Sequence, residues 1–344
     1  IIVSDFLTYS NKMDIIMLNQ YYMSNGENPE MRIKSFLKLV EIQTKIASVT
    51  PFVFGVLYSL YMYKSLKFLN VLFFFISLIC FDMFTTALNN YQDYKKAIKK
   101  EGYNYEVHNA IGQFGLKEST VVITIAVLFI IAIVFGILTF LRTDYYLLAL
   151  GMLSFLMGIL YSAGPLPISR TPFGELFSGG FMGLVIPFLV VYASIFDYSP
   201  LTLVINNTNI IFNINWRLLL PVILSSLPAV FCIANIMLAN NICDMEDDFI
   251  NKRYTLPIQI GKKKALVLYG AIYALAYLDI IFCAVMGYLP LISLLTLLTA
   301  CKVYKNIKVF YDLQTKKDTF GLAVANLMLI MFPLILSLIV SLIV

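Results

Sequence analysis

Long apolar runs separated by short polar stretches dominate the pattern along this chain. A helix needs about 20 apolar residues to cross a bilayer, and scanning for runs of that kind predicts nine spans. They are residues 46–63, 68–88, 119–140, 145–163, 176–196, 217–238, 266–288, 289–301 and 322–344, the eighth being short. The runs are uniform, whereas the strands of a membrane β-barrel would alternate over segments of about 10 residues.

The composition agrees with a membrane protein. Hydrophobic residues make up 60% of the chain and charged residues 13%, against about 25% charged in soluble domains. We therefore predict an all-α, polytopic protein of the cell membrane, a bundle of about nine transmembrane helices. Residues 1–45 are expected to be an N-terminal cytoplasmic or interfacial segment, and residues 46–344 the transmembrane domain.

Basic residues predict the orientation of this bundle. All but four of the 25 Lys and Arg residues lie in the N-terminal segment or in loops after even-numbered spans; the exceptions are Lys64, Lys67, Arg142 and Arg217. By the positive-inside rule these loops face the cytoplasm. We expect the lipid bilayer to be a partner of the chain, and no nucleic acid.

A polar pentapeptide, Asn-Asn-x-x-Asp, occurs at the ends of spans 2 and 6, at residues 89–93 and 240–244. The second copy continues to Asp248, so Asn240, Asp244 and Asp248 share one helix face. A carboxylate at the end of a membrane helix is costly unless an ion or a charged substrate pairs with it. The alternative is that these Asn residues only cap the ends of helices. Capping explains a single copy of the motif better than it explains two matching copies on the same membrane face.

The first copy also belongs to a longer stripe. Asp82, Thr86, Asn89 and Asp93 follow one another at steps of four, three and four residues, which places them on one side of a helix. The stripe is expected to face the interior of the bundle.

The loop after the second copy places carboxylates directly before cations. Mg²⁺ binds through one or two carboxylates, water and phosphate oxygens, while Lys and Arg bind the remaining phosphate charge. We therefore predict a Mg²⁺–diphosphate site whose metal ligands are Asp93, Asp244, Asp248, Asn89 and Asn240. A solvated, charged loop is the alternative, and it explains Asp244 and Asp248 poorly.

A third polar segment, residues 164–175, joins spans 4 and 5 on the same side. Its prolines and glycines preclude a regular helix, and Arg170 and Glu175 are expected to face the site. Lys45, just before span 1, is expected to contact a phosphate or the lipid headgroups. The residues predicted to bind substrate are Asn89, Asn90, Asn240, Asn241, Lys45, Lys95, Arg170, Lys252 and Arg253. Asp279 and His108 are expected to be structural.

From residue 32 onward this arrangement resembles the UbiA superfamily of intramembrane prenyltransferases. Two stretches carry the resemblance: Asn240-Asn241-x-x-Asp244-x-x-x-Asp248 followed by Lys252-Arg253-x-Thr255-Leu256 and Gly261, and Gly164-Pro165-x-Pro167 with Gly174-Glu175. Both are similar to the branch of the family that acts in menaquinone biosynthesis. The resemblance implies transfer of a polyprenyl group from an allylic polyprenyl diphosphate to an aromatic acceptor, 1,4-dihydroxy-2-naphthoate. Mg²⁺ would be the cofactor, and Asp93, Asp244 and Asp248 the catalytic residues.

The first motif departs from the family pattern, which is Asn-Asp-x-x-Asp. Asn90 stands where that pattern has its first Asp. An amide contributes no negative charge, so we expect weaker metal binding beside Asp93 than beside Asp244 and Asp248.

Two alternatives remain at this point. Another branch of the same family would use 4-hydroxybenzoate, haem or a glycerol phosphate as acceptor. A cation-coupled transporter could also contain a repeated acidic motif, but its charges are expected near the middle of the bilayer. The carboxylates of this chain are predicted at one face, beside cationic loops.

Overall fold

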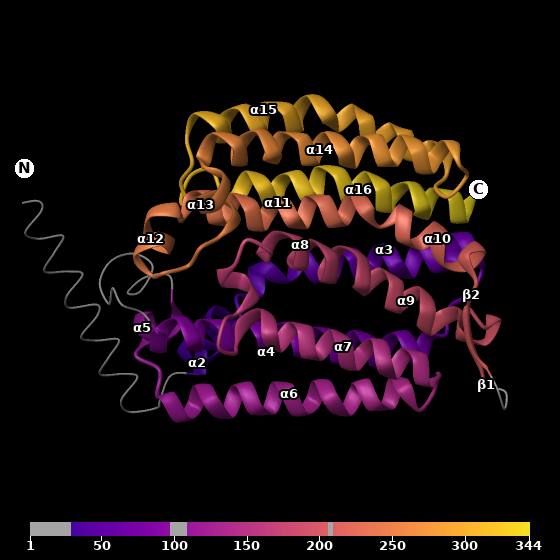
Figure 1. Cartoon of the computed structure of the whole chain (residues 1–344), viewed down its shortest axis with the longest axis horizontal. Helices are drawn as coiled ribbons and strands as arrows, with labels where there is room; N and C mark the ends of the chain where they lie inside the picture. The colour runs from indigo at the N-terminus through magenta and orange to yellow at the C-terminus, as the bar shows by residue number, and fades with distance from the viewer. Residues whose placement is uncertain (1–28, 97–108, 206–208) are drawn as a thin grey trace, which may run out of the picture.

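The structure, a computed structural model, describes residues 29–96, 109–205 and 209–344. Figure 1 shows a bundle whose long helices run side by side. Its α-helices are α2 (Pro29–Leu39), α3 (Ile46–Tyr63), α4 (Phe68–Lys96), α5 (Ala110–Phe114), α6 (Glu118–Phe140), α7 (Tyr145–Ser162), α8 (Gly174–Ser178), α9 (Ile186–Ile195), α10 (Trp216–Ser225), α11 (Leu227–Cys243), α12 (Met245–Ile250), α13 (Leu256–Ile260), α14 (Lys262–Val285), α15 (Ala300–Asp312) and α16 (Gly321–Ile343). Short 3₁₀ segments are η1 (Ile42–Lys45), η3 (Ile168–Arg170), η5 (Phe196–Tyr198) and η6 (Leu291–Thr299), and η4 (Gly179–Val185) is a π-helix.

Within the described ranges, seven helical stretches are long and apolar enough to cross a membrane, or eight if α10 and α11 form one bent span. These two helices meet at 40°, next to Pro228 in the first turn of α11. Proline has no backbone N–H to continue a helix. The multi-span helical fold is confirmed, and the count of nine is approximate.

The predicted eighth span, 289–301, is shorter than the helical segment that the structure has there. In the structure η6 continues directly into α15, so this segment extends over residues 291–312. Both parts contact α14, and Figure 1 shows α15 beside it. The apolar scan ended early because α15 has Lys302, Lys305 and Lys308, whose long side chains reach polar surroundings while their stems stay in apolar ones.

The second span also extends further than predicted. The sequence pattern ends it at residue 88, whereas α4 continues to Lys96. Residues 89–96 are too polar for the apolar scan but remain compatible with a helix. The first Asn-Asn-x-x-Asp motif therefore lies in the last turns of α4.

Helix α11 lies at the centre of the packing and contacts α14, α16, α8 and η4. Glycines permit the closest of these approaches: a Cβ added to Gly183 of η4 would lie 2.4 Å from Val230 Cα of α11. By contrast, α6 has one strongly exposed apolar side, which includes Ile123, Ile130 and Ile137. Such a side suits contact with lipid.

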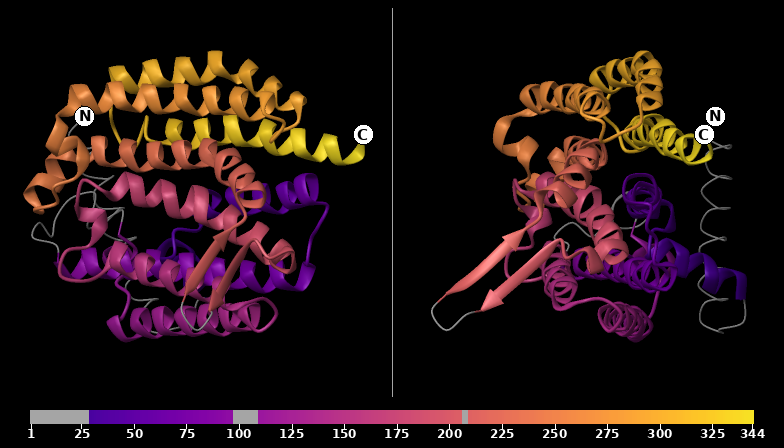
Figure 2. Two further views of the ribbon diagram at one scale, coloured as in Figure 1. Left: turned by 45° about the vertical axis from the view of Figure 1, so that its right-hand side comes forward. Right: turned by 90° about the vertical axis from the view of Figure 1, so that its right-hand side faces the viewer.

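One element departs from the all-helical expectation. Strands β1 (Leu201–Ile205) and β2 (Ile210–Ile214) form an antiparallel hairpin in which Leu201 pairs with Ile214. Five-residue strands are too short to register in a scan for spans. Figure 2 shows the hairpin projecting from the helices, and Figure 1 places it at the opposite end of the bundle from α12 and α13.

Two of the basic residues that broke the charge pattern lie near the start of α4, away from its polar end. Lys67 Nζ is 2.9 Å from Asp197 Oδ2, and Arg142 Nε donates to Asn70 Oδ1 at 2.9 Å. These contacts lie at the end of the bundle where α4 begins. The repeated motifs lie at the opposite end, where α4 ends.

Candidate active site

Both Asn-Asn-x-x-Asp motifs and the segment before α8 meet at one end of the bundle. Arg170 Nη2, from η3, donates to Asp93 Oδ1 of α4 at 3.0 Å. Arg253 Nη1 lies 3.6 Å from the other oxygen of Asp93, and Arg253 Nε lies 3.2 Å from Asp248 Oδ1. A single guanidinium therefore joins the two motifs.

Backbone contacts hold this arrangement together. Asp244 separates α11 from α12, and its N–H donates to Asn240 O at 3.1 Å. The N–H of Tyr254 donates to Arg170 O at 3.0 Å, which fastens the loop of the second motif to η3. Thr255 Oγ1 donates to Asp248 Oδ2 at 3.4 Å.

The Asp248 carboxylate is the most buried of the three acidic residues among the predicted metal ligands. Only 4% of the residue is exposed, and burial raises the pKa of its carboxyl to about 6, while Arg253 acts in the opposite direction and Asp244 adds to the increase. Desolvation favours the neutral acid. A cation beside Asp248 therefore does more to keep it ionised than it would at an open surface.

Sequence reasoning missed Lys316, which pairs with Asp244. Lys316 Nζ lies 2.5 Å from Asp244 Oδ2, reaching it from the loop between α15 and α16. The only signal in the sequence was that Lys316 is a basic residue in a loop predicted to lie on the same membrane face as the second motif. Nothing in a single sequence pairs two residues that are this far apart.

A buried pair beneath the motifs tests whether the site suits a metal and a diphosphate. Asn241 Nδ2 donates to Glu175 Oε1 of α8 at 2.9 Å. Glu175 Oε2 and Asn241 Oδ1 are buried without a hydrogen-bond partner, a costly state for polar atoms. Arg253 Nε is also buried, and its 3.2 Å contact with Asp248 Oδ1 is an ion pair without hydrogen-bond geometry. Carboxylate and amide oxygens suit Mg²⁺, and a guanidinium N–H suits phosphate. The donor set fits both groups.

The same donors do not form a closed metal cage. Over the described part of the chain, no three His, Cys, Asp or Glu side chains are clustered closely enough to hold an ion. Asp93, Asp244 and Asp248 each lie beside a Lys or Arg instead. This set fits a metal that shares its coordination shell with substrate oxygens, as Mg²⁺ commonly does.

Asn89 and Asn240, predicted as metal ligands, and Asn90, predicted to bind substrate, differ in where their side chains lie. Asn89 Nδ2 donates to Asp93 Oδ2 at 3.3 Å, and Asn240 is partly exposed one turn before Asp244. Asn90 points the other way: its Nδ2 donates to Leu39 O at 2.9 Å and to Glu41 Oε1 at 3.3 Å. The side chain of Asn90 contacts the N-terminal segment.

Three predicted cationic residues also lie outside this cluster. Lys45 Nζ is 2.6 Å from Asp82 Oδ1, in a buried pair. Lys95 forms an exposed ion pair with Glu118 at 2.8 Å. Lys252 is exposed at a left-handed backbone position, with φ of 55°. His108 lies outside the described residues, and Asp279 accepts from Cys283 Sγ at 3.7 Å.

A cavity of about 160 Å³ lies between α4, α7, η4 and α9. Its walls are largely apolar and include six aromatic residues: Phe74, Phe81, Phe155, Tyr161, Phe177 and Phe181. Polar groups of Asp82 and Ser48 also line it. The same helix, α4, has both Asp82 and the first motif.

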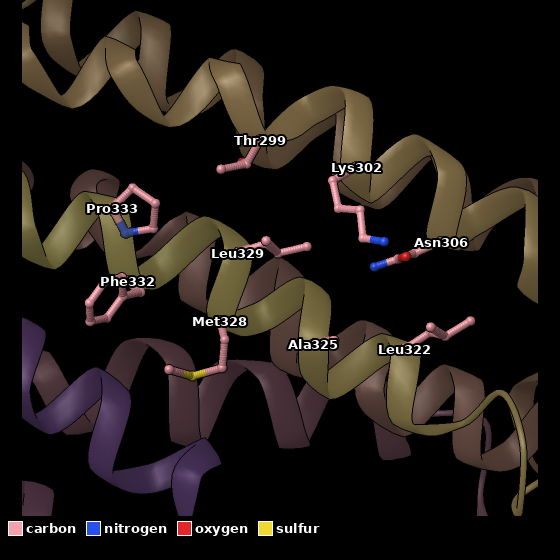
Figure 3. Close-up of a pocket in the computed structure, with 9 residues that line it drawn as sticks. All are labelled: Thr299, Lys302, Asn306, Leu322, Ala325, Met328, Leu329, Phe332 and Pro333. Atoms are coloured by element: carbon pink, nitrogen blue, oxygen red, sulfur yellow. The ribbon is translucent and has the colours of Figure 1, made fainter.

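A larger hollow of about 600 Å³ lies elsewhere, between α16 and the segment formed by η6 and α15 (Figure 3). It is lined by Lys302 and Asn306 on one wall and by apolar residues such as Leu329 and Phe332 on the other. Phe332 is 59% exposed, so this hollow opens sideways from the bundle. None of its lining residues belongs to either motif.

Comparison with known proteins assigns the family. The model of the UbiA prenyltransferase family matches residues 48–338. The chain belongs to the UbiA prenyltransferase family. It is also 31% identical over 252 residues to 1,4-dihydroxy-2-naphthoate octaprenyltransferase of Bacillus subtilis (strain 168), a match covering 73% of each protein. The predicted family is thereby confirmed, and the chain is an enzyme of the prenyltransferase class.

Solved UbiA structures share the fold. The apo UbiA homolog from Aeropyrum pernix K1 superposes with a TM-score of 0.64 at 19% identity, covering 86% of this chain and 98% of that one. A UbiA homolog from Archaeoglobus fulgidus, bound to GPP and Mg²⁺, gives 0.61 at 12% identity, covering 90% and 100%. At these identities the likeness concerns the fold alone.

Proposed function

We propose that this chain transfers a polyprenyl group from an allylic polyprenyl diphosphate to 1,4-dihydroxy-2-naphthoate, in menaquinone biosynthesis. The observation that carries the proposal is that the Arg253 guanidinium contacts both Asp93 of the first motif and Asp248 of the second. This contact creates one set of acids and cations at the end of the helical bundle. The activity named for the Bacillus subtilis relative supports the choice of acceptor.

The acids and cations have complementary roles in this proposal. Asp93, Asp244 and Asp248, with the amide oxygens of Asn89 and Asn240, would hold Mg²⁺, which when bound neutralises charge on the departing diphosphate. Arg170 and Arg253 present N–H groups to phosphate oxygens. Lys316 sits at the same site and adds a third positive charge.

The apolar part of the bundle serves the second half of the reaction. Loss of diphosphate leaves an allylic cation that water would destroy, so the reacting carbon must be kept dry. The largely apolar walls of the 160 Å³ cavity exclude water and suit an isoprenoid tail or an aromatic ring. A ring bound there is close to the helix that holds Asp93.

The alternatives now differ in strength. The family match removes the support for a transporter. The ion pairs also lie at one end of the bundle, at the ends of α4 and α11, whereas a transporter would have its charges near the middle of the bilayer. Another acceptor, such as 4-hydroxybenzoate, haem or a glycerol phosphate, remains the second candidate. We also propose that this end faces the cytoplasm, because most basic residues belong to its loops.

The test is a transfer assay on membranes that contain the chain. Labelled polyprenyl diphosphate is incubated with each acceptor of the panel, with Mg²⁺ and with a chelator. We expect a labelled product from 1,4-dihydroxy-2-naphthoate that disappears on chelation and returns with Mg²⁺. Transfer to another acceptor alone would reject the menaquinone assignment, and transfer unaffected by chelation would reject the metal.

A further inference from the structure

A buried ion pair lies inside the bundle, apart from the acids and cations described above. Lys45 Nζ donates to Asp82 Oδ1 at 2.6 Å, to Thr86 Oγ1 at 2.7 Å and to Asp82 O at 3.2 Å. Ser48 Oγ donates to Asp82 Oδ2 at 2.6 Å. Lys45 is 4% exposed and Asp82 is 6% exposed.

Fold stability is a poor explanation for such a pair. Removing two charges from water costs several kcal/mol for each ion, and apolar side chains of similar size often stabilise a protein as well or better. Ionisable residues inside a membrane bundle are more often functional. The geometry also leaves Lys45 little capacity to hold a diphosphate, because its ammonium already donates to Asp82 and Thr86.

Asp82 retains the capacity to bind something else. A carboxylate has about four lone-pair sites for hydrogen bonds, and Lys45 and Ser48 each use one of them. Both Asp82 and Ser48 line the cavity, whereas Lys45 does not. Asp82, with lone pairs to spare, therefore borders a space whose walls include Phe81 and Phe155.

The cavity lies on the same two helices, α4 and α8, that carry residues near the end of the bundle. Asp82 lies 11 residues before Asp93 on α4, which is about 16 Å along a helix axis. The opposite wall includes Phe177 and Ser178, within one turn of Glu175 on α8. A flat molecule in this cavity would span part of the distance from Asp82 to the metal–diphosphate site.

We propose that Asp82 accepts a hydrogen bond from a ring hydroxyl of the aromatic acceptor, with Lys45 and Ser48 fixing its carboxylate. This inference rests on the proposed function. An ionised carboxylate binds a hydroxyl donor and repels a carboxylate, so the acceptor's own carboxylate points away from Asp82. A phenolic hydroxyl that donates to an anion also becomes more electron-releasing, which favours attack by the ring on an allylic cation. The selected substrate class is a hydroxylated aromatic ring.

The decisive experiment combines two changes: a substitution at Asp82 in the protein and methylation of a hydroxyl in the acceptor. Transfer is measured for wild type and Asp82→Asn with 1,4-dihydroxy-2-naphthoate and with each of its two monomethyl ethers, which lack one hydroxyl donor. A hydrogen bond to a charged group corresponds to roughly a 10- to 100-fold change in kcat/KM. We expect that loss on methylating one hydroxyl in wild type, and a clearly smaller loss for the same ether in Asp82→Asn, because the neutral amide oxygen is a weaker acceptor than the carboxylate.

Two controls separate binding from damage to the fold. The KM for the polyprenyl diphosphate should stay within about threefold of wild type in Asp82→Asn, since Asp82 does not hold the diphosphate. Asp279→Asn removes another acid from a membrane helix outside the cavity and should leave the kinetics unchanged. If Asp82→Asn fails to fold with Lys45 unpaired, Lys45→Met with Asp82→Asn gives a neutral pair for the same experiment.

Each outcome is decisive. Equal losses on methylation in wild type and variant would overturn the inference, as would a changed donor KM with an unchanged acceptor KM, which would place the prenyl tail in the cavity. Wild type alone suffices where both variants misfold: two ethers that react as fast as the parent compound exclude a bound hydroxyl. If wild type transfers the prenyl group to no hydroxylated ring, the proposed function itself fails.

Discussion

Asn90→Asp restores the residue that the family pattern has at this position, and the structure predicts that the change harms the protein. Asn90 is 8% exposed, and its amide donates to Leu39 O and Glu41 Oε1. An ionised aspartate cannot donate, so it would leave the Leu39 carbonyl unpaired and set a second carboxylate against Glu41. From the sequence alone, the same substitution would be expected to strengthen metal binding.

The magnitude follows from these two contacts. A buried carbonyl left without its partner costs about 1–3 kcal/mol. Two carboxylates at about 3.3 Å repel by about 5 kcal/mol at an effective dielectric constant of 20, although Glu41 is only half-buried and can turn toward water. We therefore expect a total loss of about 2–4 kcal/mol in the free energy of unfolding.

Thermal unfolding in detergent micelles measures this loss. Asn90→Asp should lower the melting temperature by several degrees, and by less at acidic pH, because protonation of either carboxyl removes the repulsion and restores a donor. Asn90→Ala isolates the lost hydrogen bond, and Glu41→Gln added to Asn90→Asp should recover the electrostatic part. An unchanged melting temperature together with tighter Mg²⁺ binding by calorimetry would show that position 90 faces the metal, and would refute this argument.

Three further predictions concern the site. Asp244→Asn keeps the size of the side chain and removes its charge, so turnover should fall by about 100-fold or more, and undiminished turnover would exclude Asp244 as a metal ligand. Arg253→Gln should lower kcat/KM by at least about 100-fold, with partial recovery in Arg253→Lys, which lacks the planar fork that spans two acids; full activity of the lysine variant would mean that charge alone matters. In a cysteine-free background, Gln92→Cys and Glu246→Cys should resist an impermeant thiol reagent in intact cells, while Phe212→Cys on the hairpin should react, and the reverse pattern would invert the proposed topology.

The fold was largely predictable because its signal is local. A run of about 20 apolar residues indicates a membrane helix whatever its neighbours are, and 46–63 matches α3 at both ends. The predictions failed where hydropathy and helix formation diverge. The polar end of α4 and the lysine-bearing α15 are helical without being uniformly apolar, so the scan ended both too early.

The site was predictable only in its motifs. Repetition and fourfold spacing indicated Asp93, Asp244 and Asp248, because these are properties of consecutive residues. The partners of these residues were not readable, since pairing Lys316 with Asp244 or Lys45 with Asp82 depends on how distant helices pack. Asn90 illustrates the same limit: its place in the motif indicated a substrate-binding residue, whereas its side chain contacts Leu39 and Glu41.

The ion pairs of the site constrain how the proposed metal–diphosphate complex can bind. Arg170 lies against Asp93, Arg253 lies between Asp93 and Asp248, and Lys316 lies against Asp244. The acids suit a divalent cation and the basic groups suit phosphate oxygens, so each member of a pair has a new partner in the complex. We therefore expect binding to exchange partners within an already neutral set, which avoids leaving any charge unpaired in a poorly hydrated site. A metal bound without diphosphate pairs with the acids but leaves Arg170, Arg253 and Lys316 without a counter-charge. Diphosphate bound without metal pairs with these cations but leaves the acids without one. The two ligands should therefore bind cooperatively.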